Sequence, residues 1–396
     1  MIRRFAALIA AGIFFLTTPT FAQSVPTEPP EGVPRDIEPF DAPTQPQPST
    51  STVPQIPALP EEGYEGLEFL VYHQDGVMAF AVIADHEMYE LRPVLARGHV
   101  PGLATVSQMN APNAIATINA SYFGKDGTLY GNTRIDGLTA GTTYYVRSAL
   151  GILADGSTIF ARQAYRGVVE FKDKSVVVGG VNCERTADSV VVYNGWNGAL
   201  TGTNEHGIEI VVRDGTVTEV FKGTGNNFIP PDGFVVSANG KAMEDFADVE
   251  VGDAMTFDED FINVEHGADF NEAIHIIGAG PTLVKNGNIY VTADAEQFPP
   301  DIRVGRAPRS AIGITQYGDY IFAVVDGRQA HSKGCTLEEW ARILKFSFGA
   351  VEAINLDGGG STELYFKGSL VNIPSDGHER PVGDALTIIR KAISND

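Results

Sequence analysis

The chain has 396 residues, with 50 acidic and 28 basic side chains and a formal net charge of -22 at pH 7. Such an acidic surface repels nucleic acid and anionic lipid, so charge excludes those partners more than it names others. Two cysteines, Cys183 and Cys335, are too few for a disulfide framework, and the sequence leaves a single bridge and two buried thiols equally open.

The first residues have the features of an export signal. Arg3 and Arg4 precede an apolar run from Phe5 to Leu16, and a small residue, Ala22, stands where a signal peptidase would cut. The run is too short to span a bilayer. We therefore expect a signal peptide over residues 1–22 and a periplasmic or secreted protein without a transmembrane segment after cleavage, with an uncleaved anchor as the alternative.

The next part of the chain changes composition twice. Residues 23–63 are dense in Pro, Thr, Ser, Gln and Glu and hold few large apolar side chains that would offset the entropy of ordering, which predicts a disordered linker. Beyond it, short apolar runs alternate with turn pairs such as Asp155-Gly156 at the spacing of β-strands joined by hairpins. The predicted fold over residues 64–396 is mixed α+β, strand-rich with few helices, with a β-rich insertion at about 166–271.

Two segments place polar groups at the ends of predicted strands. The strand from Ile115 leads into Asn119, which can bond sugar hydroxyls, and Tyr122, which can stack on a pyranose face or lie in the core. Further on, the sequence RSALGI from Arg147 is echoed by RSAIGI from Arg309. The echo predicts two related strands flanking one site, with chance similarity of two apolar strands as the alternative.

The sequence predicts one helix with a defined start. Thr336 can cap it, with Glu339 completing a capping box, and Trp340 lies on its apolar face. Gly349 is the expected stop. The helix would join two strands in a β-α-β unit, and parallel pairing would bring the residues that follow them, Asp326 and Asp357, to the same sheet edge, where ligands usually bind.

The residues at that edge suit the chemistry of a sugar phosphate. Asp326 and Asp357 are the expected catalytic acids, with Glu338 or Glu363 as substitutes, and the sequence does not say which acts as nucleophile, base or metal ligand. Asp326, Asn355 and Asp357 also offer the oxygen ligands that Ca²⁺ or Mg²⁺ prefers, although the same groups can bind sugar hydroxyls. The remaining candidates are a glycine run whose amides can form an anion-binding nest, two hydroxyls, and three arginines that can hold phosphate: Gly358, Gly359, Gly360, Ser361, Thr362, Arg309, Arg328 and Arg380.

Taken in order, these blocks resemble the phosphodiester glycosidase family, whose animal members uncover mannose phosphate by removing N-acetylglucosamine. The matching blocks are NASYF from Asn119, GAGP from Gly278, APRSAIG from Ala307, DGR from Asp326, NLDGGGST from Asn355 and ERP from Glu379. The resemblance implies a mixed α/β catalytic domain acting on α-linked sugar 1-phosphodiesters, and a pocket made by Asn119, Arg309, Asp326, Arg328, Asn355, Asp357, Ser361, Thr362 and Arg380.

The sequence also departs from the family pattern. Ala120-Ser121 stands where glycines are common, and the β-rich insertion is absent from compact members, so the substrate is expected to differ. With an export signal, a phosphodiester-linked glycan of an envelope or exopolysaccharide is the expected substrate. A noncatalytic glycan-binding or envelope-assembly protein is the main alternative. A serine hydrolase using Ser361 with His331 or His378 is a weaker one, because no nucleophile elbow surrounds the serine.

Overall fold

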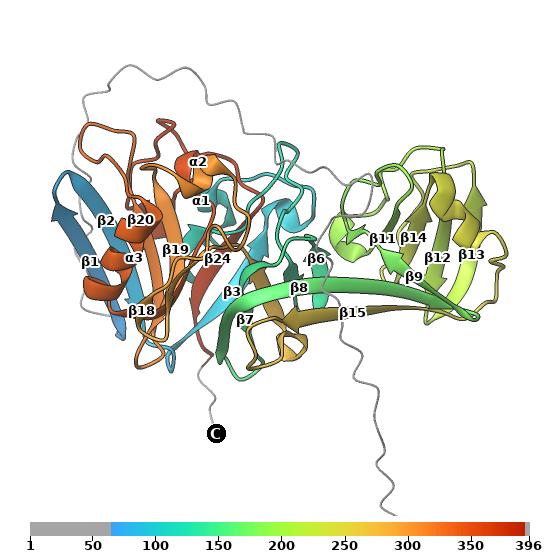
Figure 1. Ribbon diagram of the computed structural model, residues 1–396, viewed down its shortest axis with the longest axis horizontal. Helices are drawn as coiled ribbons and strands as arrows, with labels where there is room; N and C mark the ends of the chain where they lie inside the picture. The colour runs from blue at the N-terminus through green and yellow to red at the C-terminus, as the bar shows by residue number, and fades with distance from the viewer. Residues whose placement is uncertain (1–64, 393–396) are drawn as a thin grey trace, which may run out of the picture.

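The computed structural model describes residues 65–392 (Figure 1), so the predicted signal peptide and linker lie outside the described residues. Within this range the chain forms four β-sheets and three short α-helices: α1 (Val106–Met109), α2 (Pro300–Arg303) and α3 (Leu337–Phe346). The predicted strand-rich, mixed α+β fold with few helices is confirmed.

Two sheets form the half of the molecule that carries both predicted acids. The first sheet runs in the order β1-β2-β20-β19-β21-β17-β18. Its strands are β1 (Leu67–Gln74), β2 (Val77–Ala84), β17 (Thr282–Lys285), β18 (Asn288–Ile289), β19 (Arg309–Thr315), β20 (Tyr320–Val325) and β21 (Ala350–Asn355). The second sheet runs in the order β23-β22-β4-β24-β3. Its strands are β3 (Tyr89–Leu95), β4 (Ala114–Asn119), β22 (Leu364–Phe366), β23 (Ser369–Leu370) and β24 (Asp384–Arg390).

The other two sheets extend the molecule sideways. The third sheet runs in the order β15-β8-β7-β16-β5-β6, with β9 also paired to β8, and the fourth in the order β10-β11-β14-β12-β13. The third consists of β5 (Thr133–Ile135), β6 (Leu138–Gly141), β7 (Arg147–Ile152), β8 (Thr158–Phe171), β9 (Lys174–Val178), β15 (Met255–Asn263) and β16 (His275–Gly278). The fourth consists of β10 (Gly180–Val181), β11 (Val190–Tyr193), β12 (Ile208–Arg213), β13 (Thr216–Lys222) and β14 (Gly233–Ala238).

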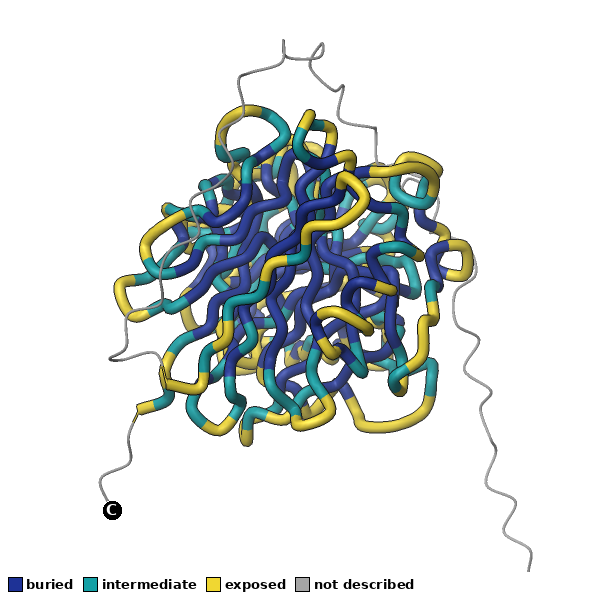
Figure 2. The backbone as a smooth tube through the Cα atoms, turned by 90° about the vertical axis from the view of Figure 1, so that its left-hand side faces the viewer, coloured by how far each residue is buried: buried dark blue, intermediate teal, exposed yellow. Residues whose placement is uncertain are grey.

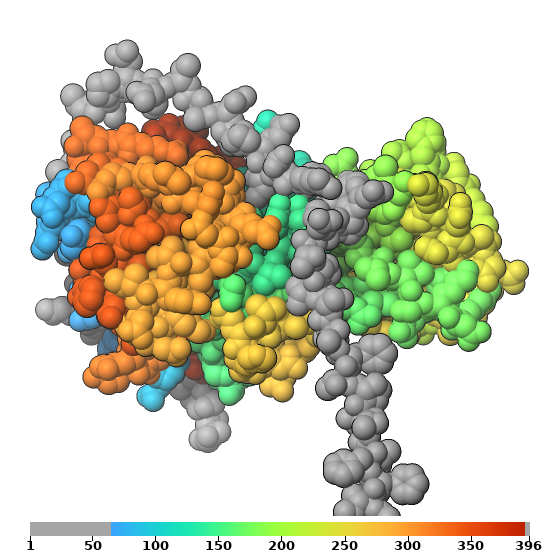
Figure 3. Space-filling view, viewed as in Figure 1, coloured from blue at the N-terminus to red at the C-terminus, as the bar shows by residue number. Residues whose placement is uncertain are grey.

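The long strands β8 and β15 pair along their length and run from one half of the molecule to the other (Figure 1). We call residues 172–254, which lie between these two strands, the insertion lobe, and the rest of the described chain the core lobe. Figure 3 shows the insertion lobe, green to yellow, as a separate end of the molecule. It has its own apolar core, in which Val192, Ile210 and Val236 are buried.

Alternation along β2 explains how the core lobe is layered. Phe80 and Val82 point into the cluster between the first and second sheets, whereas Ala79 and Ala81 face the opposite way, against α3. Small side chains on that face let Trp340 of α3, which is fully buried, pack closely on the sheet. Figure 2 shows these strands as a mostly buried block with its exposed positions at the loops.

The predicted start of α3 is confirmed. Thr336 Oγ1 accepts from the Glu339 N–H at 3.2 Å, and the Glu339 carboxylate accepts from the Thr336 N–H at 3.0 Å. The predicted stop is misplaced. The helix ends at Phe346, the Ser347 N–H still donates to the Ile343 carbonyl, and Gly349, with a φ of 78°, makes the turn into β21 instead.

Direct parallel pairing of the two strands joined by α3 is wrong. β20 and β21 are each antiparallel to β19, which lies between them. The connection through α3 therefore passes over one strand position in the sheet. That position is occupied by β19, which forms a hairpin with β20. The two strands still run in the same direction, so their carboxyl ends share one edge, separated by two strand spacings or about 10 Å.

The question of a disulfide is settled by the positions of the cysteines. Cys183 and Cys335 are both free thiols, one in the insertion lobe and one buried under α3. Burial raises the pKa of each thiol to about 12.

Candidate active site

Loops from three strands meet at the edge where β20 and β21 end. Asn119, the last residue of β4, donates from Nδ2 to the Asp357 carbonyl at 2.7 Å. Asn372 donates to Asp326 Oδ1 at 3.1 Å and to the Thr362 carbonyl at 2.9 Å. These bonds hold the segments that follow β20 and β21 together at one place.

Asp357 is the acid of this edge whose side chain keeps partial exposure. Even so, the surrounding protein removes most of its water, and this desolvation raises the pKa of Asp357 to about 6. The Ser361 hydroxyl, the Gly358 N–H and the charge of Arg380 offset part of that rise. The Gly358 bond to Oδ1 measures 2.9 Å, whereas Ser361 lies close without reaching hydrogen-bond geometry. Such a carboxylate is poised for proton transfer near neutral pH.

Asp326 occupies a different environment. It is 1% exposed, and its oxygens accept from Asn372 Nδ2 and from the Ile373 N–H, both at 3.1 Å, and bond to His331 Nε2 at 2.9 Å. A carboxylate enclosed in this way does not reach a bound sugar. Its place in the site is to orient His331, whose Nδ1 is buried and lacks a hydrogen-bond partner among residues 65–392.

Several buried polar atoms beside Asp357 are left without partners in the described structure. They are Asn355 Oδ1, Ser361 Oγ, Thr362 Oγ1 and Glu363 Oε2. Buried polar atoms are nearly always hydrogen-bonded, and each one that is not costs about 1–3 kcal/mol. Four of them in one loop next to a partly exposed carboxylate indicate a site completed by a polar ligand.

The three predicted phosphate-binding arginines differ in exposure and in the protein groups that their guanidinium groups contact. Arg328 is exposed, and no carboxylate within residues 65–392 pairs with it. Its guanidinium lies over Gly359, where an added Cβ would be 3.3 Å from Nη1. Arg380 is held by Asp376, with its Nη2 at 2.7 Å from the carboxylate. Arg309 is buried and donates to three backbone carbonyls, those of Cys335, Ile302 and Gly305.

The main effect of the glycine run is to leave space for the arginine side chains, and not to present backbone amides to an anion. The Gly358 N–H donates to Asp357 and the Gly359 N–H to the Pro308 carbonyl at 3.0 Å, so the predicted nest does not present these two amides to a ligand. At Gly360 a Cβ would lie 2.0 Å from Arg380 Nη2. Glycine is therefore required where the arginines approach the backbone.

Asn119 and Tyr122 are internal supports. Every polar side-chain atom of Asn119 is bonded within the protein, since its Oδ1 accepts from the Ser310 hydroxyl at 2.7 Å. Tyr122 is 6% exposed, packs on Phe298 and donates to the Gly280 carbonyl at 3.0 Å. Because its ring offers no open face, the predicted stacking of a sugar on Tyr122 is wrong.

Two further acids complete the cluster. Asp384, at the start of β24, is fully buried and accepts from the Ser121 N–H at 2.8 Å and hydroxyl at 2.7 Å. Burial, together with the charge of Asp357, raises the pKa of Asp384 to about 6. Burial and the charge of Glu379 raise the pKa of Glu363 to about 8. Sequence reasoning missed Asp384 because an acid before an apolar strand usually marks an exposed strand end. Glu338, the other substitute named from the sequence, is exposed on α3.

The predicted cation ligands differ in how many oxygens they leave without a protein partner. The carboxylate oxygens of Asp326 bond to protein groups. Among Asp326, Asn355 and Asp357, the residue with a buried oxygen that lacks a partner in the described structure is Asn355. Among residues 65–392, the His, Cys, Asp and Glu side chains close enough to share an ion are Asp85, His86 and Asp319, at another loop of the core lobe.

A family model matches a segment just under half as long as the chain. Residues 206–389 match the model of the phosphodiester glycosidase family. Over these residues the chain is similar to the phosphodiester glycosidase family. The matched segment includes Asp326, Arg328, Asp357 and Arg380, and it also contains part of the insertion lobe.

Individual relatives agree over shorter stretches. The chain is 34% identical over 116 residues to N-acetylglucosamine-1-phosphodiester alpha-N-acetylglucosaminidase of Mus musculus, covering 27% of this chain and 22% of that enzyme. It is 42% identical over 81 residues to the SPbeta prophage-derived uncharacterized protein YomE of Bacillus subtilis, covering 20% of this chain and 12% of that protein. The matches thus span less than a quarter of either relative.

The fold is shared more widely than the sequence. A hypothetical protein from Synechocystis superposes with a TM-score of 0.71 at 22% identity, covering 82% of this chain and 62% of that one. This likeness concerns the fold alone. Within residues 65–392, no helix combines the length and the apolar character needed to cross a membrane.

Proposed function

We propose that this protein is an exported hydrolase that cleaves the glycosidic bond of sugar 1-phosphodiesters, with an envelope or exopolysaccharide glycan as substrate. The observation that carries the proposal is the setting of Asp357. It is partly exposed, its pKa is raised to about 6, and unpaired polar atoms and the unpaired Arg328 surround it. The match to the phosphodiester glycosidase family model supports the reaction class.

In the proposed reaction, Asp357 accepts a proton from water while the water oxygen bonds to the anomeric carbon. The bond from that carbon to the phosphate oxygen breaks, and the phosphate monoester leaves with the electron pair. Since this leaving group is already a stable anion, it needs positive donors more than a strong general acid, and Arg328 supplies them. His331 donates to Asp326 from Nε2, which leaves Nδ1 to accept from a sugar hydroxyl.

The test is release of free N-acetylglucosamine from an α-linked N-acetylglucosamine 1-phosphodiester, measured across pH. Asp357 must be ionised to act as a base, so we expect kcat/KM to rise with pH through about 6, the pKa of this carboxyl. A folded protein that binds the diester and releases no sugar at any pH would favour the noncatalytic glycan-binding alternative.

The serine hydrolase alternative has one element in its favour, the bond between Asp326 and His331. However, Ser361 Oγ and His331 Nδ1 both lack partners, so they are not bonded to each other. We expect a phosphonate serine probe to leave the protein unlabelled, and stoichiometric labelling of Ser361 would reverse this assignment.

A further inference from the structure

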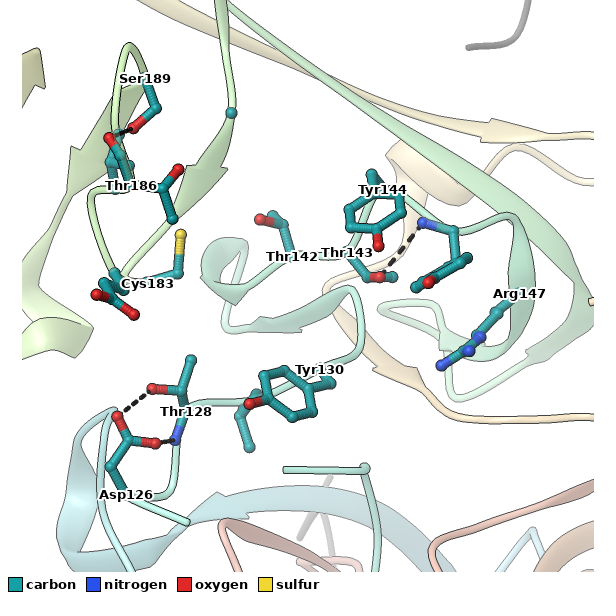
Figure 4. A pocket seen from close by; sticks show the side chains of 15 residues that line it. Asp126, Thr128, Tyr130, Thr142, Thr143, Tyr144, Arg147, Cys183, Thr186 and Ser189 are labelled. Atoms are coloured by element: carbon teal, nitrogen blue, oxygen red, sulfur yellow. Dashed lines mark hydrogen bonds between the residues drawn. The ribbon is translucent and has the colours of Figure 1, made fainter. Parts of the chain in front are cut away.

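A pocket lies between the core lobe and the insertion lobe (Figure 4). It encloses about 1020 Å³ of space, open solvent included. One wall comes from the core-lobe segment 126–147 and the other from residues 179–191 of the insertion lobe. We call it the interlobe cleft.

Arg147 lines one end of the cleft as a buried cation that forms no salt bridge within residues 65–392, although the charge of Glu296 acts on it. It is 4% exposed, and its Nε and Nη1 lack hydrogen-bond partners in the described residues. The guanidinium carbon lies 4.1 Å from the ring centroid of Phe298 and 4.4 Å from that of Tyr145. These ring faces stabilise the charge in part, but a buried cation without a directly paired anion remains costly. Desolvation accordingly lowers the pKa of Arg147.

The repeat noticed in the sequence has a structural counterpart here. Arg147 opens β7 and Arg309 opens β19, both are buried, and the charges of both act on Tyr122. Arg309 donates to three carbonyls of the protein, whereas the Nε and Nη1 of Arg147 find no acceptor within residues 65–392. The matched position therefore shows what Arg147 lacks, which is a set of acceptor oxygens.

Backbone hydrogen bonds connect the cleft to the sheet edge where β21 ends and Asp357 lies. Ser148, next to Arg147, accepts through its carbonyl from the Ala279 N–H at 3.0 Å. The following residue, Gly280, donates to the Asn355 carbonyl at 2.8 Å. A ligand group at Arg147 therefore lies a short step along the backbone from the loop that carries Asp357.

The opposite end of the cleft has another character. Tyr130 lies there with the exposed acids Asp126 and Glu184 near it. Tyr144 lies between this end and Arg147, with its ring centroid 4.2 Å from that of Tyr145 (Figure 4). Both tyrosines are half-buried and can pack on sugar rings. Carboxylates accept hydrogen bonds from sugar hydroxyls but repel anions. The cleft thus offers one place for an anion and, beyond it, a surface for a neutral saccharide.

We propose that the interlobe cleft binds the part of the substrate beyond the scissile bond, with Arg147 holding a second phosphate and the tyrosines holding the saccharide between. The identity of the ligand rests on the function proposed above. The substrate is then a glycan with repeated phosphodiester links. The insertion lobe determines which glycan the protein binds.

The experiment compares two synthetic diesters on the full mature protein. Both carry α-linked N-acetylglucosamine 1-phosphate on the same disaccharide, and one bears a second phosphodiester on that disaccharide. We expect the wild type to prefer the second compound about 10- to 100-fold in kcat/KM and in calorimetric affinity, the range for hydrogen bonds to a charged group. Arg147→Met should bring this ratio close to one, and Arg213→Met, an exposed arginine of the insertion lobe, should keep it.

Each outcome bears on a separate claim. Hydrolysis of both diesters with no preference in the wild type, or an unchanged preference in Arg147→Met, overturns the phosphate site and leaves the proposed function standing. Phosphate-dependent binding without hydrolysis removes the proposed function and retains the site. If Arg147→Met does not fold, Tyr144→Ala decides, since it should weaken binding of the disaccharide compounds by about tenfold, and wild-type affinity there contradicts the cleft.

Discussion

Three aspartates near one sheet edge differ in burial and in hydrogen-bond partners, and these differences determine what each carboxyl group can do. Asp326 accepts from several protein donors and serves to orient His331. Asp357 is partly exposed with a raised pKa, and Asp384 is fully buried with a raised pKa. The same side chain thus acts as a support, as a candidate base and as a buried acid on which the charge of Asp357 acts.

Replacing Asp384 by Asn should change how stability depends on pH. The pKa of Asp384 is raised from 3.8 to about 6, so the folded state binds this proton more tightly than the unfolded state. Stability is therefore lost as pH rises from about 4 through about 6, by roughly 3 kcal/mol in total. Asp384→Asn cannot ionise and should be relatively more stable than the wild type at pH 7 than at pH 4, as measured by urea unfolding.

The control is Asp214→Asn, at an exposed turn of the insertion lobe. It should follow the wild-type pH dependence. An Asp384→Asn protein with the same pH dependence as the wild type would show that Asp384 is not ionised at a cost in the folded state.

At the scale of elements, local signals predicted local structure. The capping box at Thr336 and the apolar face of α3 depend on residues close in sequence, and both are found. The β20-β19-β21 order was missed, because β19 enters that sheet through contacts that no local pattern encodes. For the same reason the sequence of its own loop predicts a role for Asp357, whereas no local pattern predicts the burial of Arg147 and Asp384. Their burial comes from strands distant in the chain.

The cap of α3 gives a direct test of this local account. Thr336→Ala removes the bond to the Glu339 N–H and should lower the free energy of unfolding by about 1 kcal/mol. Arg342→Ala, at an exposed position of the same helix, should change it by less than about 0.5 kcal/mol. Equal effects of the two substitutions in urea unfolding would mean that the cap does not stabilise the helix.

At the scale of the whole molecule, one continuous pair of strands, β8 and β15, connects two lobes with separate apolar cores. Polar contacts also join the lobes, including the bond from Asn182 Nδ2 to the Thr139 carbonyl at 3.3 Å. No disulfide joins the two described cysteines, so packing and these contacts hold the arrangement.

The absence of a disulfide predicts the behaviour of the purified protein toward reductant. Denaturation without reductant should expose two titratable thiols, and reductant should leave the Tm unchanged, because Cys183 and Cys335 lie in different lobes. A titre near zero would mean that the chain forms a bridge.

The measurement that tests the central claim most directly is turnover of an α-linked N-acetylglucosamine 1-phosphodiester by Asp357→Asn beside Asp214→Asn. If Asp357 is the reacting carboxylate, kcat should fall about 100-fold or more while the Tm stays near that of the wild type. Asp214→Asn should match the wild type. Full activity of a folded Asp357→Asn protein would contradict the assignment of Asp357 and with it the proposed reaction at this edge.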